Sequence, residues 1–137
     1  MATVLEDLGT FLQTAAVGTL TEDLFLGIMP DKPDVCTALL ENPGDDSISV
    51  LTRTAGKPPV ERPSITVLCR GEKDDHDVPR VEAESIYAVI NNVVDTSLSG
   101  TRYLSIEARQ PPFAVGRDEN GRSLIGFNVD IWKEPNA

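Results

Sequence analysis

The chain has 137 residues, 40% of them hydrophobic, which suits one compact domain with its own core and leaves little room for two. Its 22 acidic residues outnumber 12 basic ones and give a formal net charge of -10, which disfavours non-specific binding to nucleic acid through phosphate contacts. No apolar run approaches the roughly 20 residues that span a bilayer, and the N-terminus lacks a basic region followed by an apolar block, so we expect folding in a cytoplasm and no membrane partner.

The first predicted elements are a short helix and a strand. Apolar residues recur at helical spacing across 4–12, Thr3 is placed to cap the first turn, and Glu6 is placed to reach back toward it. The apolar run 24–29 is closed by a proline and suits a strand better than more helix. We therefore expect a helix over 4–12, a strand over 24–29 and then a linker, PDKPDV.

The middle of the chain predicts three more strands. Segments 36–41 and 48–53 alternate in polarity, and NPGDDS between them predicts a turn, so the two are expected to pair antiparallel. Segment 54–63, TAGKPPVERP, contains three prolines and a glycine, which favour an extended, exposed connection free to contact partners. Segment 64–70, SITVLCR, alternates clearly and predicts a strand.

The two cysteines fall inside these alternating runs and lie far apart in the sequence. Cys36 and Cys69 are therefore expected to be buried, reduced thiols of the core, and neither a disulfide framework nor a zinc site is indicated.

A second helix and a final strand pair complete the prediction. Asp77 and Pro79 mark the helix start, its apolar stripe is read as far as Val94, and the helix is expected to end near Asn91 to Asp95. Strands are expected over 103–110 and 123–132, with the sequence Asn-Gly before the second one as a strong hairpin signal. The paired prolines before that turn predict a bulge or an exposed edge, because they lack amide donors.

The order of these elements predicts an α+β domain. No strand-helix-strand crossover repeats, so we expect an antiparallel or mixed sheet of about five to six strands, flanked by two helices and ending in a long C-terminal hairpin.

Candidate chemistry is sparse. Asp74, Asp75, His76 and Asp77 form the densest cluster of potential metal ligands, and a small metal-dependent hydrolase that uses them is one alternative. Consecutive side chains of a loop diverge, however, and acidic residues before a helix are favoured by its dipole, so a solvated loop is the preferred interpretation. With one histidine in the chain and no GxSxG motif, we expect no catalytic residue, no metal and no cofactor, and hence no enzyme.

Two regions are candidate contact surfaces. A locally basic zone in an acidic chain could meet an acidic partner, and polar residues on the outer face of the final hairpin could meet a neighbouring copy. An ordinary solvated surface is the competing interpretation of both, and a peptide-binding or ligand-binding role of the segment 54–63 is another. The candidate interface residues are Arg53, Lys57, Arg62, Glu107, Arg109, Arg117, Asp118, Arg122, Asn128 and Asp130.

The segment RPSITVLCRG, followed by a helix and then by YLSIEARQPPFAVGRDENGRSLIGFNVDIW, resembles the tail terminator or minor capsid proteins of long-tailed bacteriophages. In that family a strand ending in Arg-Gly precedes a helix, and the final hairpin carries a QxPxxxGxDxxGR-like turn. The resemblance covers 36–132. The positions that fit the pattern are Arg70, Gly71, Gln110, Pro112, Gly116, Asp118, Gly121, Arg122, Phe127 and Asn128.

The resemblance implies a structural virion protein in which residues 1–137 form a single ring-forming domain. Such a subunit would assemble in the host cytoplasm into a hexameric ring at the head-proximal end of the tail, stop polymerisation of the tail tube protein and join the tail to the head connector protein. DNA would pass through the lumen without specific binding, because a negative ring repels the duplex. A head-tail connector or another tail-completion subunit remains an alternative.

Overall fold

A computed structural model describes residues 3–48, 60–91 and 93–135 of the chain. Its strands form one mixed, seven-stranded sheet in the order β1-β2-β3-β7-β5-β4, and β6 also pairs with β7. The predicted α+β class with two helices is confirmed, with one strand more than expected. The elements are α1 (Val4–Thr14), β1 (Leu24–Leu26), β2 (Cys36–Ile48), β3 (Val60–Lys73), α2 (Asp77–Ile90), β4 (Val93–Leu98), β5 (Thr101–Ala108), β6 (Phe113–Arg117) and β7 (Arg122–Lys133).

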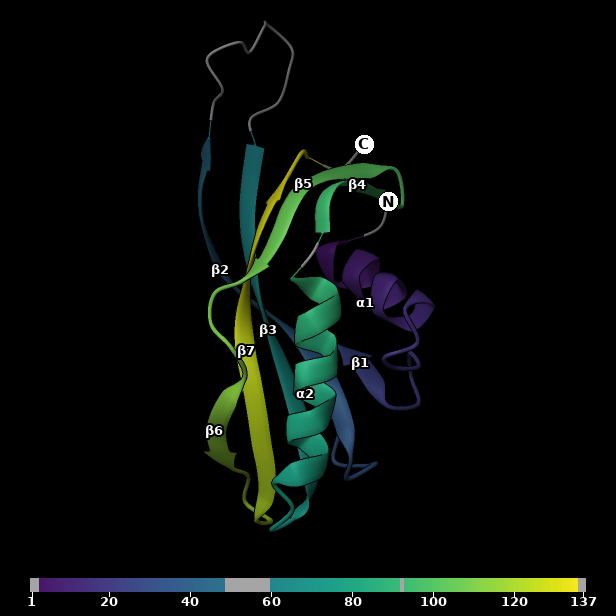
Figure 1. The fold of residues 1–137 in the computed structure, drawn as a ribbon, viewed down its shortest axis with the longest axis vertical. Coiled ribbons are helices and arrows are strands. Elements are labelled where there is room, and N and C mark those ends of the chain that lie inside the picture. The colour runs from purple at the N-terminus through teal and green to yellow at the C-terminus, as the bar shows by residue number, and fades with distance from the viewer. Residues whose placement is uncertain (1–2, 49–59, 92, 136–137) are drawn as a thin grey trace, which may run out of the picture.

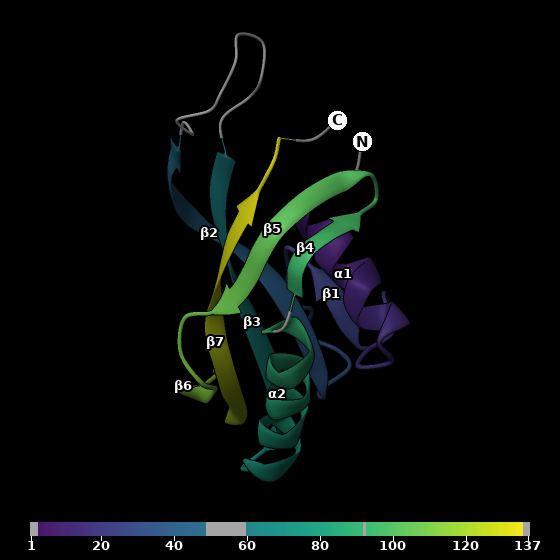
Figure 2. The ribbon, with the colours of Figure 1, turned by 45° about the horizontal axis from the view of Figure 1, so that its top comes forward.

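The sheet curls around the two helices and leaves its other face uncovered by helix (Figures 1 and 2). α2 packs on β3, β5 and β7, while α1 contacts β1 on one side and β4 on the other. Within the described ranges no helix has the length and apolar character needed to cross a membrane. The core lies between the helices and the inner face of the sheet, and includes Leu8, Leu12, Ile65, Val67, Cys69, Ile86, Ile90, Ile106, Phe127 and Ile131.

Both helices begin where side chains can satisfy their first amide groups. Thr3 caps α1 as predicted, because its Oγ1 accepts a hydrogen bond of 3.2 Å from the Glu6 amide. At the start of α2 the Asp75 carboxylate plays the same role, accepting from the amides of Asp77 and Val78 at 3.1 and 3.3 Å. The start of each helix is therefore stabilised by a side chain close to it in the sequence.

α2 ends at the early limit of the predicted range, Asn91 to Asp95, but the assignment of Val93 and Val94 to its apolar stripe is wrong. The helix ends at Ile90, and Asn91 follows as its C-cap, with a side-chain Oδ1 that accepts from the Ala108 amide of β5 at 2.8 Å. The next β-branched residues start β4, which pairs antiparallel with β5, and Val94 is 71% exposed. Val93 and Val94 continue the helical spacing by chance, because in the structure both residues pair with β5.

The predicted turn at 42–47, and with it the pairing of 36–41 with 48–53, is also wrong. β2 continues through Pro43 and Gly44 and pairs with β3, from Cys36↔Arg70 to Ile48↔Val60. The register shifts on both sides of Asp45, so the residues typical of a turn lie in a bulged strand. A Cβ at Gly44 would stand 2.4 Å from the Arg62 carbonyl oxygen, which explains the glycine.

The extended connection predicted for 54–63 holds only in part of its length. Residues 60–63 belong to β3, whereas 54–59 lie outside the described residues, as do 49–53. Pro63 has no partner in the register of β3 with either neighbouring strand, which is where a residue without an amide donor is tolerated.

The C-terminal hairpin is present in a modified form. β5 pairs with the second half of β7, and β6, after the break at the paired prolines, pairs with the first half. At the tip Gly121 has a φ of 75° and donates to the Asp118 carbonyl at 3.0 Å, whereas Asn120 keeps a negative φ. The turn is therefore of type I followed by a left-handed glycine, and the type I′ turn that Asn-Gly favours does not form.

A buried polar pair joins α1 to the sheet. The Tyr103 hydroxyl of β5 donates a hydrogen bond of 2.5 Å to Oδ2 of Asp7, and both residues are almost completely buried. Oδ1 of Asp7 has no hydrogen-bond partner. Burial first, and the contact with Asp7 second, raise the pKa of Tyr103, so its hydroxyl keeps the proton that it donates.

Replacing Tyr103 by phenylalanine is expected to lower the free energy of unfolding by about 1–3 kcal/mol, because both Asp7 oxygens are then buried without a partner. Urea unfolding followed by circular dichroism measures the change. Tyr87→Phe is the matched control, since the ring contact with Phe127 is kept and no hydrogen bond of its hydroxyl is present in the described structure. Equal losses in the two variants would contradict the role given to the Tyr103–Asp7 bond.

Candidate functional site

The uncovered sheet face brings four of the predicted interface residues together on neighbouring strands. Glu107 of β5 lies opposite Asp130 of β7. Arg109 binds the Asp130 carboxylate with two nitrogens, Nη2 to Oδ1 at 2.5 Å and Nε to Oδ2 at 3.2 Å. About half of the Arg109 side chain remains exposed, so the pair lies at the surface.

Asn128 lies next on this face and belongs to a polar ladder that crosses three strands. Its Oδ1 accepts from Thr66 Oγ1 of β3 at 2.7 Å and from Asn42 Nδ2 of β2 at 3.3 Å, and its amide donates to Gln110 Oε1 at 2.9 Å. These bonds fix the relative position of β2, β3 and β7. Asn128 is thus a half-buried structural residue at the margin of the exposed surface.

Arg62 lies with its guanidinium carbon 5.8 Å from the ring centroid of Trp132, a cation–π contact between β3 and β7. Trp132 is 40% exposed, an unusual setting for the one tryptophan of the chain. The predicted contact residues Arg53 and Lys57 lie outside the described residues.

The tip between β6 and β7 carries the remaining three candidates. Arg117 Nη1 forms an ion pair of 2.5 Å with Asp74, in the loop before α2. Arg122 Nε forms another with Asp118 at 2.6 Å, but its side chain is only 8% exposed. Arg117 is therefore a surface residue, and Arg122 is part of the interior of the subunit.

Arg122 and Arg70 together hold the loop 30–34 against the sheet, and we call this pair the arginine clamp. Arg70 donates to four backbone carbonyls of the loop, at distances between 2.6 and 3.2 Å. Arg122 binds the carboxylates of Asp31 at 3.0 Å and Asp34 at 2.9 Å. Lys32 first and Arg122 second hold the pKa of Asp34 below its ordinary value.

Sequence reasoning missed the clamp, although both arginines belong to the motifs that carried the family resemblance. The signal that could have found it is an arginine inside an alternating strand, where a buried guanidinium needs several acceptors nearby. The proline-rich linker with two aspartates supplies those acceptors. The linker 30–34 is not part of the sheet, so its backbone carbonyls are free to accept hydrogen bonds from Arg70.

The cluster Asp74, Asp75, His76 and Asp77 is divided among separate partners. Asp74 pairs with Arg117, and Asp75 caps α2. His76 Nδ1 lies 3.8 Å from an Asp77 carboxylate that is almost fully exposed. Across 3–48, 60–91 and 93–135, no three His, Cys, Asp or Glu side chains are arranged to hold a metal ion.

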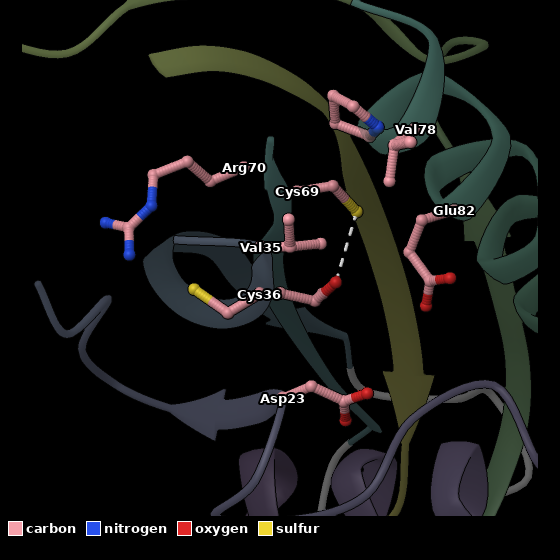
Figure 3. Close-up of a pocket in the computed structure, with 9 residues that line it drawn as sticks. Asp23, Val35, Cys36, Cys69, Arg70, Val78 and Glu82 are labelled. Atoms are coloured by element: carbon pink, nitrogen blue, oxygen red, sulfur yellow. Dashed lines mark hydrogen bonds between the residues drawn. The ribbon is translucent and has the colours of Figure 1, made fainter. Parts of the chain in front are cut away.

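A small cavity of about 80 Å³ opens between the start of α2 and the ends of β2 and β3 (Figure 3). Both cysteines line it and both are buried free thiols, as predicted. Their sulfur atoms point in opposite directions in Figure 3, so they are not placed to form a disulfide. Burial raises the pKa of Cys69 to about 12, which leaves this thiol unreactive at neutral pH.

Asp23 and Glu82 line this cavity and also a second hollow of about 390 Å³ beside it, between α2 and the segment after α1. Their carboxylates extend from opposite walls toward one space (Figure 3). We call the two hollows with their shared carboxylates the acidic groove. Val35 and Val78 lie on its wall and are 38% and 49% exposed, so the groove has apolar as well as acidic surface.

The sequence matches the family described as bacteriophage tail terminator protein over residues 11–134. The chain belongs to this family. Nearly all of the terminator fold described above, including the arginine clamp, the acidic groove and the tip, lies within the matched range. The terminator is thus a structural protein of the phage tail, as the resemblance implied.

A solved structure supports the fold assignment of the terminator. A chain in the virion of a native gene transfer agent (GTA) particle aligns with a TM-score of 0.59 and 14% identity, covering 98% of this chain and 87% of that one. At this identity the likeness shows a shared fold. No curated protein sequence matches the terminator chain.

Proposed function

We propose that this chain is the ring-forming subunit at the head-proximal end of a phage tail, where it stops polymerisation of the tail tube and joins the tail to the head connector. The observation that carries the proposal is the family match over residues 11–134. The similarity to a chain of a gene transfer agent virion agrees with a place in a virion. Residues 1–137 act as one domain in this proposal.

Exposed strand edges and an open sheet face give the subunit surfaces for contact with copies of itself. Every residue of β6 is exposed, including Phe113 at 42% and Val115 at 50%. An edge strand of this kind offers unpaired backbone groups to another chain. Contacts between two different surfaces of identical subunits close into a ring when the rotation between neighbours closes.

The charge of the chain suits a ring around DNA. A formal charge of -10 on each copy makes the assembly strongly negative, so a duplex in the lumen is repelled by the wall and slides without binding. The hexameric state is part of the proposal, by analogy with the family.

The test is the mass of the purified protein, alone and mixed with tail tubes, followed by imaging of the assembly. We expect a closed ring with a central hole that caps one end of the tube and prevents further growth. Particles that lack this gene product are expected to carry tails of abnormal length that do not join filled heads. Tails of normal length attached to filled heads in such particles would refute the proposal.

A further inference from the structure

A cavity of about 190 Å³ lies between α1 and the turn that joins β4 to β5. Residues 97–99 line it from the sheet side, and one face of α1, the helix that contacts β4, lines it from the other (Figures 1 and 2). The residues of that helix face are Asp7, Thr10, Phe11 and Thr14. The cavity shares no lining residue with the acidic groove, so it is a separate place on the subunit.

Asp7 is the one charged residue in this lining, and only half of its carboxylate is satisfied. The residue is 1% exposed. Oδ2 accepts the hydrogen bond of Tyr103, whereas Oδ1 is buried without a hydrogen-bond partner. Such an oxygen is rare in a folded protein, because nothing replaces the water that it loses on burial. The structure therefore points to a missing partner for Oδ1.

The missing partner should carry a positive charge. Asp7 belongs to none of the ion pairs between described side chains. The buried ammonium of Lys133 lies opposite Tyr103 in the sheet, but it is bound to Glu61 at 2.9 Å. A buried carboxylate is costly unless it is paired, and a tyrosine hydroxyl or a water molecule supplies a hydrogen bond without a charge. A cation in the cavity would supply both.

The rest of the lining indicates which cation fits. Phe11 and Leu98 add half-buried apolar surface. A divalent metal ion is poorly matched, because it prefers several charged oxygen ligands and Asp7 offers the only carboxylate. An ammonium group on an alkyl stem matches better, since its three N–H groups can use the carboxylate and neutral hydroxyl groups while the stem packs on the apolar part. The exposed residues that carry those hydroxyl groups are Thr10, Thr14, Ser97 and Ser99.

We propose that this cavity binds a primary ammonium group on an alkyl stem, with the nitrogen between Asp7 Oδ1 and the hydroxyl groups and the stem along Phe11 and Leu98. The carboxylate turns slightly on binding to bring Oδ1 to the ammonium. The cavity is far larger than one water molecule needs, so it has room for a few methylene groups. A free alkylamine and a lysine side chain of a second copy both carry this group. The proposal does not depend on ring formation.

Titration of isotope-labelled full-length protein with n-butylammonium chloride, followed by amide NMR spectra, tests the site. We expect saturable shifts at Asp7, Thr10, Phe11 and residues 97–99, with a Kd of about 1–10 mM, a range open to a ligand of so few atoms. Sodium chloride at equal ionic strength controls for screening, and tetramethylammonium chloride controls for a cation without N–H donors. Shifts that do not saturate, or that either control salt reproduces, would overturn the proposal.

Variants test the role of each lining group. Asp7→Asn should weaken butylammonium binding about 10-fold or more, because the amide keeps an acceptor for Tyr103 and loses the charge. Glu6→Gln makes the same change at an exposed position outside the cavity and should leave the Kd unchanged. Thr10→Val keeps the side-chain shape, removes one hydroxyl group and should weaken binding about 3-fold. It keeps the test open if Asp7→Asn does not fold, and an unchanged Kd in every folded cavity variant would refute the site.

The source of the ammonium is decided by sedimentation of the wild type with and without saturating butylammonium. If a lysine of a second copy fills the cavity, the amine should weaken self-association, and Asp7→Asn should do so in its absence. If a free amine is the ligand, self-association should be the same in all of these samples while the amine still binds. Failure to bind the amine refutes this cavity site alone, whereas failure to self-associate, with or without tail tubes, bears on the proposed function alone.

Discussion

Replacement of Arg70 by lysine is expected to lower the free energy of unfolding by about 2–3 kcal/mol, since a buried guanidinium makes several charge-assisted bonds that an ammonium cannot reproduce. Arg70 is 4% exposed and its fork serves four carbonyls of the loop 30–34 at once. Lysine keeps the charge and offers a single nitrogen, so some of those carbonyls lose their donor. Guanidinium chloride unfolding measures the loss.

The control lies in the same loop. Lys32 forms an ion pair of 3.1 Å with Asp34, but its side chain is 73% exposed. Lys32→Ala should leave stability nearly unchanged, because exposed pairs contribute little. If Arg70→Lys proved equally harmless, the loop would be held by other contacts and the arginine clamp would lose its structural role.

Phe127→Ala is expected to cost about 3–5 kcal/mol, the range for removing a large aromatic side chain from a packed core. Phe127 is 1% exposed on the helix-facing side of β7, and its ring meets Tyr87 of α2 edge to face at a centroid distance of 5.6 Å. The substitution therefore removes apolar contact area and the aromatic pair that locks α2 onto the sheet. The midpoint of denaturant unfolding reports the loss.

Phe113→Ala is the matched control, because the same atoms are removed from β6 at a position that is 42% exposed. We expect a much smaller loss of stability there. If β6 is a contact edge, the Phe113→Ala variant should fold normally but self-associate less strongly than the wild type. A Phe127→Ala variant as stable as Phe113→Ala would mean that the core is packed differently.

The sequence predicted the parts of the fold that are decided locally. The Thr3 cap, the alternation across SITVLCR and the strand pair around the tip were all recovered, because each depends on residues close in the chain. The bulged passage through Pro43 and Gly44 was missed, since turn-forming residues also fit a bulge once β3 supplies the ladder. β4 was missed because two valines continued a helical spacing by chance.

In the candidate site, too, features set by nearby residues were predicted and features set by tertiary packing were missed. Glu107, Arg109 and Asp130 were placed on one face by simple alternation, and the structure brings them together. The acidic groove could not be predicted, because Asp23 and Glu82 come from segments that only the packing of α2 beside the end of α1 makes neighbours. The same holds for the arginine clamp, which joins residues up to 91 positions apart.

The way that β5 and β6 divide one edge of β7 has a dynamic consequence. We expect β6, whose residues are all exposed, to open from its half of β7 more readily than β5 opens from the other half, since the paired prolines separate the two ladders. Amide hydrogen exchange is expected to be faster along β6 than along β5.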